Sequence, residues 1–181
     1  VRKYKSAAAV GESGDTTVAM DMGATIGTYL RQYGFNMDFA PVADVLTNPD
    51  NTVIKDRSFG SDSQLVADMV CAEMQGLNEH QILSVVKHFP GQGATAGDSH
   101  DGAVSTDKSL DDLLANELVP FQQAGNAPAG KQLGRRGTEH QLCVDRHTPE
   151  GFPLCQLFPD KKAQAADDDQ RSQRQQHHRV I

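Results

Sequence analysis

The fold is decided by the stretch Val85-Val86-Lys87-His88-Phe89-Pro90-Gly91-Gln92-Gly93-Ala94-Thr95-Ala96-Gly97-Asp98-Ser99-His100-Asp101-Gly102. The apolar run that leads into it, residues 82–86, is typical of a buried strand. That strand ends in the basic pair Lys87-His88, and the proline and glycines that follow predict a loop. The loop carries Asp98 and His100. Because α/β folds place their chemistry where strands end and loops begin, this stretch predicts a site at a strand end.

Helices and strands are expected to alternate around this stretch. Apolar residues at helical spacing predict three helices, and short apolar runs predict two strands. The order is a helix over Thr16–Tyr33 stopped by Gly34, a strand over Phe35–Val45, a helix over Ser61–Glu79 capped by Ser61 or Ser63, a strand over Ile82–Phe89, and a helix from Ser109 toward Phe121. Alternation of this kind favours an α/β fold with neighbouring parallel strands and right-handed crossovers.

Three blocks of the sequence together resemble a known enzyme family. Lys87-His88-Phe89-Pro90-Gly91 followed by Asp98-Ser99-His100 resembles the signature of family 3 glycoside hydrolases, in their β-N-acetylglucosaminidase (β-N-acetylhexosaminidase) branch. Residues 37–45 and 56–60 resemble two further blocks of the same family, in the same order. The resemblance implies a TIM (β/α)8 barrel. Since such a barrel needs about 250 residues, the 181-residue chain is expected to hold a partial barrel, incomplete at both ends.

The resemblance runs from about Gly11 to Ala124, and the composition of the sequence changes after it. Residues 125–181 lose the apolar periodicity and become rich in Gln, Asp and Arg. We therefore expect two parts, a fragment of the family's catalytic barrel over residues 1–124 and an unrelated tail over residues 125–181. The tail is expected to be irregular, either as a disordered extension or as the product of a shifted reading frame.

His100 and Asp98 are the candidate catalytic residues. A histidine gives and takes a proton near neutral pH, and a neighbouring carboxylate fixes its tautomer and favours its charged form. The resemblance implies that the pair forms the acid/base dyad of this branch, in place of the usual carboxylic acid. The alternative is a surface histidine with an ordinary hydrogen bond.

Lys87, His88 and Arg57 are the candidate substrate-binding residues. By resemblance, Lys87 and His88 hold hydroxyl groups of the terminal sugar, for which charged donors are well suited. The planar guanidinium of Arg57 can hold two sugar oxygens. The alternatives are a solvated lysine, a core histidine, and an ion pair of Arg57 with Asp56 or Asp44.

Two positions limit what the resemblance implies. Asp38 and Asp44 could be taken for the paired carboxylates of a glycosidase, but we interpret them as structural, because the family's aspartate nucleophile belongs to a later strand end that nothing here matches. Gln92 stands where the family usually has histidine. A glutamine cannot titrate, so no proton transfer is expected at that position.

The resemblance implies a retaining β-N-acetylglucosaminidase that releases terminal N-acetylglucosamine from chitin-type or peptidoglycan-derived saccharides. Two alternatives stay open: a phosphorylase of the same family, and a catalytically dead fragment that lacks the nucleophile. The resemblance implies no metal and no organic cofactor.

Composition and charge bear on the partners. The chain has 17 basic and 24 acidic residues, and the excess of acid falls in residues 1–124, which argues against nucleic acid. No apolar run reaches the roughly 20 residues of a membrane span. Three cysteines show no metal-ligand spacing, and Cys71 is expected to be a small buried residue of a helix. The oligomeric state stays open, as does the compartment, with bacterial cytoplasm and secreted or envelope locations both compatible.

Overall fold

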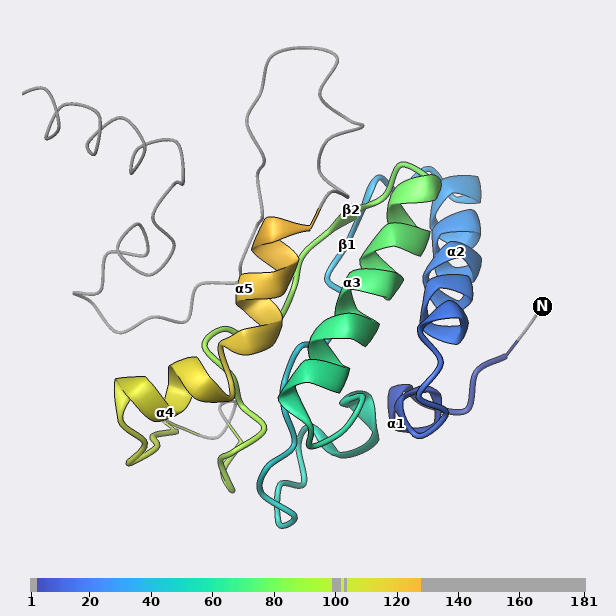
Figure 1. Cartoon of the computed structure of the whole chain (residues 1–181). Coiled ribbons are helices and arrows are strands. Elements are labelled where there is room, and N and C mark those ends of the chain that lie inside the picture. The colour runs from blue at the N-terminus through green and yellow to red at the C-terminus, as the bar shows by residue number, and fades with distance from the viewer. Residues whose placement is uncertain (1–2, 99–101, 103, 128–181) are drawn as a thin grey trace, which may run out of the picture. The chain divides into compact units, whose positions relative to one another are not determined.

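A computed structural model describes residues 3–98, 102 and 104–127 of the chain (Figure 1). Helices and strands alternate along this part, as the sequence predicts. In chain order the elements are α1 (Ala7–Gly11), α2 (Thr16–Gln32), β1 (Met37–Asp38), the 3-10 helix η1 (Lys55–Arg57), α3 (Ser63–Glu79), β2 (Leu83–Ser84), α4 (Leu110–Ala115) and α5 (Val119–Asn126).

The two strands lie side by side and run parallel, which confirms the predicted pairing. Met37 pairs with Leu83 and Asp38 with Ser84, and α3 connects the two strands. Both strands are shorter than predicted, since regular pairing stops before Pro41, which has no N–H to donate. A single parallel bridge between Val42 and Lys87 continues the pairing beyond the proline. The α/β class is therefore confirmed.

Helix α2 follows the predicted helix to within one residue, but it buries a different set of side chains. Asp15 caps its first turn by accepting a hydrogen bond from Thr17 N at 2.9 Å. Among the apolar side chains whose spacing predicts this helix, only Met22 is buried. The other buried residues of α2 are Ala19, Gly23 and Gly27. The buried face of α2 thus consists mainly of small residues.

Helix α3 explains why small residues are needed on α2. These two helices pack against each other along their length (Figure 1). A Cβ placed on Gly23 would lie 2.2 Å from the carbonyl oxygen of Glu73, and one placed on Gly76 would lie 2.0 Å from that of Met20. The two backbones therefore approach more closely than any larger side chain would allow.

Helix α3 begins later than predicted, and its cap is neither of the predicted serines. Asp62 is the N-cap, with its Oδ1 accepting from Leu65 N at 2.8 Å. An aspartate accepts this bond as well as a serine does, so the sequence could not choose between adjacent candidates. Cys71 lies on α3 as predicted, but it is half-buried rather than buried.

The third predicted helix is divided into α4 and α5. Ser109 caps α4 as predicted, in a reciprocal pair with Asp112. The helix then breaks at Asn116, and α5 starts just before Pro120. Proline lacks the N–H that would bond to the carbonyl group of Asn116 in a continuous helix, and its ring is tolerated in the first turn of a new helix, so the helix is interrupted before Pro120. The break places Glu117 inside the protein, where it is fully buried.

None of the helices within the described residues is both long enough and apolar enough to cross a membrane. The short helix α1, in a segment for which the sequence predicts no element, contacts η1. The predicted tail falls outside the described residues from residue 128 onward, together with Cys143 and Cys155.

Candidate active site at the strand ends

The parallel pairing brings two polar segments together at the carboxyl ends of the strands. Lys87 N donates to Pro41 O at 3.1 Å, and Ala43 N donates to Lys87 O at 2.6 Å. These two bonds continue the ladder past the end of the strands. They place Asp44, which follows Ala43, beside His88, which follows Lys87.

Asp44 and His88 form a close side-chain pair. The Oδ2 atom of Asp44 lies 2.6 Å from Nδ1 of His88. The Asp44 side chain is completely buried, whereas that of His88 is 29% exposed. The carboxylate therefore lies behind the imidazole, and the imidazole forms part of the accessible surface.

Asp44 also holds the turn that follows His88. Its Oδ1 accepts from Gln92 N at 2.6 Å and from His88 N at 3.4 Å. Its backbone carbonyl accepts from Ser58 Oγ at 2.7 Å, and Ser58 directly follows Arg57. One buried residue thus connects the ends of both strands to the segment that carries Arg57. These contacts support the structural interpretation of Asp44.

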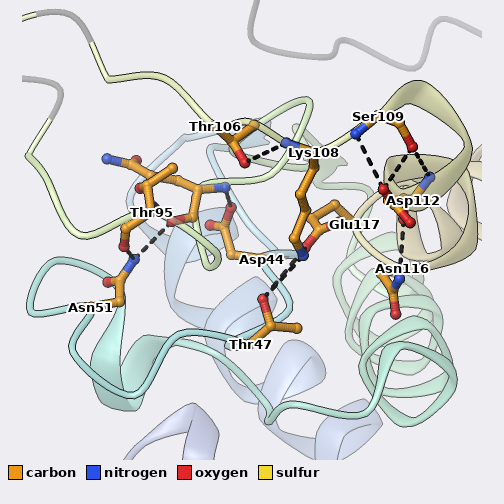
Figure 2. Close-up of polar contacts among 11 residues, drawn as sticks. Asp44, Thr47, Asn51, Thr95, Thr106, Lys108, Ser109, Asp112, Asn116 and Glu117 are labelled. Carbon is orange, nitrogen blue, oxygen red and sulfur yellow. Dashed lines mark hydrogen bonds and ion pairs between the residues drawn. The ribbon is translucent and has the colours of Figure 1, made fainter.

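Asn51, which the sequence analysis did not single out, ties the same turn to a second loop. Its amide nitrogen donates to Gln92 O at 2.7 Å and to Thr95 O at 2.8 Å (Figure 2). Its Oδ1 accepts from Val53 N and Ile54 N. The signal in the sequence was the Asn-Pro-Asp-Asn turn, because asparagine bonds readily to nearby backbone. These contacts of Gln92 are made by its backbone and do not require glutamine at that position.

The predicted substrate-binding residues lie around this centre. Lys87 and His88 are half-buried and follow β2, at the single bridge that extends its pairing. Arg57 is exposed, and its Nη1 donates to Val53 O at 3.4 Å. The carboxylate oxygens of Asp44 bond to His88 and Gln92, which leaves the alternative of an Arg57–Asp44 ion pair without support.

The predicted catalytic pair is only partly within the described structure. Asp98 is half-buried on the loop that follows the turn. His100 lies outside the described residues, as do its neighbours Ser99 and Asp101. The dyad of Asp98 and His100 therefore stays a prediction.

A buried carboxyl group lies on the helix side of Lys87. Glu73 of α3 is only 5% exposed, and its pKa is raised to about 8. Burial is the main cause and the charge of Asp38 adds to it, whereas Lys87 opposes the shift. Burial also raises the pKa of Asp38, again opposed by Lys87. Lys87 is thus a positive charge that lowers the pKa of both carboxyl groups, neither of which the sequence marked as its neighbour.

A second buried carboxyl group, Glu117, anchors the segment after the loop. Lys108 forms an ion pair with its Oε1, which also accepts from Thr47 Oγ1 at 3.4 Å (Figure 2). Glu117 also packs against the turn, because a Cβ on Gly91 would lie 2.8 Å from that of Glu117. Glu117, in the segment between α4 and α5, therefore packs against the turn that follows the strand-end site.

No cluster of three or more potential metal ligands occurs among residues 3–98, 102 and 104–127. Within that part of the chain the site consists of hydrogen-bonding and charged side chains around a buried carboxylate. Such groups suit a polar, hydroxyl-bearing ligand.

Comparison with known proteins points to a single family. The family model described as "Glycosyl hydrolase family 3 N terminal domain" matches residues 4–131. The beta-hexosaminidase LpqI of Mycobacterium tuberculosis is 47% identical over 115 residues, which are 63% of this chain and 29% of that protein. Beta-hexosaminidase A of Pseudoalteromonas piscicida is 37% identical over 105 residues, 58% of this chain and 18% of that protein.

Solved structures agree with the sequence comparison. A structure of LpqI from M. tuberculosis matches with a TM-score of 0.63 at 42% identity, covering 68% of this chain and 36% of that one. A family 3 β-N-acetylglucosaminidase from Paenibacillus matches with a TM-score of 0.64 at 38% identity, covering 65% and 22%.

In these four comparisons, which concern three proteins, the chain spans between 18% and 36% of the other chain's length. The match extends over the segments from which the family resemblance was inferred, and the relatives named above confirm the β-N-acetylhexosaminidase branch. The chain belongs to glycosyl hydrolase family 3, through the N-terminal domain of that family.

Proposed function

We propose that these residues form part of a retaining β-N-acetylglucosaminidase, which releases terminal N-acetylglucosamine from chitin-type or peptidoglycan-derived saccharides. One observation carries the proposal: in a chain of this family, Lys87 and His88 end a buried parallel strand beside the buried Asp44. A strand end with charged donors is where barrel enzymes bind their substrates.

The roles of the binding residues follow from their chemistry. Lys87 donates hydrogen bonds to sugar hydroxyl oxygens, and its half-buried position strengthens those bonds by excluding water. His88 offers the exposed part of its ring to a neighbouring hydroxyl. Arg57 reaches the sugar from the segment that Ser58 ties to Asp44.

His100 performs the proton transfers in this proposal. In the first step it gives a proton to the glycosidic oxygen while the bond from that oxygen to C1 breaks and an aspartate carboxylate bonds to C1. In the second step it takes a proton from water, whose oxygen attacks C1 and displaces the carboxylate. Asp98 orients His100 and balances its charge. The aspartate nucleophile is an implication of the family resemblance and is assigned to no residue of this chain.

The proposal includes a division of the chain. Residues 1–124 are a fragment of the family's (β/α)8 catalytic barrel, and residues 125–181 are a separate tail. The parallel β1–β2 pair joined by α3 supports the first part, since a β-α-β unit is the repeating element of such a barrel. The lost periodicity after residue 124 supports the second.

The test uses a chimera in which residues 4–131 replace the matching segment of M. tuberculosis LpqI, here called the LpqI chimera. We expect it to hydrolyse 4-nitrophenyl N-acetyl-β-D-glucosaminide, and His100→Ala to lower the rate about 10²- to 10⁴-fold. The loss should shrink for substrates with more acidic leaving groups, which depart without a proton.

Three outcomes would count against the proposal. An inactive but folded chimera would show that these residues do not support the reaction. An equal effect of His100→Ala on good and poor leaving groups would remove His100 from the acid/base role. Formation of sugar 1-phosphate when phosphate is added would identify a phosphorylase instead of a hydrolase.

A further inference from the structure

We propose that Asp44 is a positioning residue for His88: its carboxylate holds the proton on Nδ1 of the imidazole, so that Nε2 is the ring atom presented to a sugar hydroxyl. This inference rests on the proposed function for the identity of the ligand. Its structural part, the tautomer of His88, is independent of any ligand.

The pair distance fixes which ring atom meets Asp44. A separation of 2.6 Å between Nδ1 and Oδ2 is that of a short, charge-assisted hydrogen bond. An ionised carboxylate only accepts hydrogen bonds, so the proton of this bond belongs to Nδ1. The exposed 29% of the side chain then lies away from Asp44, which is fully buried.

The second oxygen of Asp44 prevents the carboxylate from turning away. Oδ1 accepts two backbone N–H groups, at 2.6 Å from Gln92 N and at 3.4 Å from His88 N. Both donors are fixed by the turn, and the turn is fixed in its place by Asn51. The orientation of the His88 ring is therefore set before a ligand arrives. This reduces the conformational entropy that the side chain loses on binding.

This arrangement makes a distinctive prediction for Asp44→Asn. The position of Oδ1 must still accept two N–H groups, so the amide oxygen of asparagine takes that place. Its NH₂ group then faces Nδ1 of His88, where it can only donate. The substitution should keep the shape of the site while moving the ring proton from Nδ1 to Nε2.

Nuclear magnetic resonance of the full 181-residue chain tests the tautomer directly. Long-range ¹H–¹⁵N spectra of the ¹⁵N-labelled protein report which ring nitrogen carries a proton. The chain has 7 histidines, and the difference from a His88→Gln spectrum assigns the signal of His88. We expect a protonated Nδ1 in the unaltered chain and an unprotonated Nδ1 in Asp44→Asn.

An unprotonated Nδ1 in the unaltered chain would overturn the inference, even if Asp44→Asn failed to fold. Asp50→Asn is the matched control, because Asp50 is exposed on the neighbouring loop. It should leave the His88 signal unchanged. A change of the same size in both variants would show that Asp44 has no special relation to His88.

The LpqI chimera tests the consequence for the ligand. Asp44→Asn should lower kcat/KM about 10- to 100-fold, which is the usual effect of losing a hydrogen bond to a charged group. If Asp44 acts through His88, the double variant Asp44→Asn/His88→Gln should be no slower than His88→Gln alone. Losses that multiply would contradict the inference. If the chimera hydrolyses no β-N-acetylglucosaminide at all, the proposed function fails, while the tautomer measured in the chain still stands.

Discussion

At the scale of single residues, two buried carboxyl groups near the strand ends differ in what surrounds them. Asp44 accepts from two backbone N–H groups and from an imidazole. Glu73 is almost as deeply buried, but its pKa is raised by burial and by Asp38 and lowered only by Lys87. Burying a carboxylate is tolerated where donors surround it and is costly where they do not. Asp44 therefore has the hydrogen-bond donors that a buried carboxyl group needs, whereas burial favours the protonated form of Glu73.

Glu73 should make the stability of the protein depend on pH. Its pKa is raised from an ordinary 4.5 to about 8, so between these values the folded state holds a proton that the unfolded state has lost. Stability then falls as pH rises through that window. We expect Glu73→Gln to lose less stability between about pH 5 and about pH 8 than the unaltered chain, by on the order of a few kcal/mol. Urea denaturation at the two pH values measures this difference.

Glu79 provides the matched control, because it lies on the same helix but is exposed. Glu79→Gln should leave the pH dependence as it is in the unaltered chain. The prediction fails if Glu73→Gln retains the full loss of stability between the two pH values.

The residues of the site differ in how far the sequence could predict them. Lys87, His88 and Arg57 could be named because they belong to recognisable blocks. Asn51 and Glu117 could not, because their roles depend on contacts made 41 and 70 positions away in the chain. Asp44 stands between Ala43 and Val45, both fully buried. Asp44 was interpreted as structural because the family resemblance places the nucleophile at a later strand end, but no periodicity could show that its partner is His88.

At the scale of elements, the N-cap of α3 shows how a helix start is chosen. Ser61, Asp62 and Ser63 are adjacent and all are good capping residues. The structure uses Asp62, whose extended backbone lets its side chain reach Leu65 N. We expect Asp62→Ala to lower the free energy of unfolding by about 1 kcal/mol. Ser61→Ala, measured by the same denaturation experiment, should change it by less than about 0.5 kcal/mol. Equal effects would show that the cap is shared.

The close approach of α2 and α3 gives a second prediction at this scale. Alanine favours an isolated helix over glycine by about 1 kcal/mol. At Gly76, however, a Cβ would lie 2.0 Å from the carbonyl oxygen of Met20 and 2.5 Å from Ala24 N. We expect Gly76→Ala to destabilise the protein by about 2 kcal/mol or more, as overpacking does. Gln75→Ala, at the exposed neighbouring position, should be nearly neutral. Thermal unfolding of both variants tests this, and a stabilising Gly76→Ala would refute the packing described.

Elements could be predicted where local chemistry decides them and not where tertiary contacts do. The bounds of α2 and the parallel pairing of β1 with β2 followed from periodicity and from element order. The buried face of α2 did not, because glycine carries no hydrophobic signal and is selected here by the backbone of α3. The only sign in the sequence of the break between α4 and α5 was Pro120. Whether a proline interrupts a helix depends on how far it lies from the start of that helix.

At the scale of the whole molecule, large apolar side chains in and beside β1 are exposed. Tyr33, Phe35, Met37 and Phe39 occupy every second position from the end of α2 to just beyond β1, and they are between 39% and 75% exposed. Within the described residues β1 pairs with β2 alone. Strands of a (β/α)8 barrel are buried on both faces. A row of this kind is therefore expected where one strand of the proposed barrel fragment faces the barrel interior.

The same substitution should then have different effects in the chain and in a complete barrel. Phe39 is 62% exposed in this structure. In the 181-residue chain, Phe39→Ser should change the free energy of unfolding by less than about 0.5 kcal/mol and should reduce self-association. In the LpqI chimera, where the proposal buries the ring, it should cost about 3 kcal/mol. Phe59→Ser is the control, because Phe59 is only 2% exposed already and should destabilise both proteins. Denaturation curves and sedimentation of the four variants provide the measurement. If Phe39→Ser is neutral in the chimera as well, the side chain that directly follows β1 does not point into a barrel, and the proposed place of this fragment in the fold is wrong.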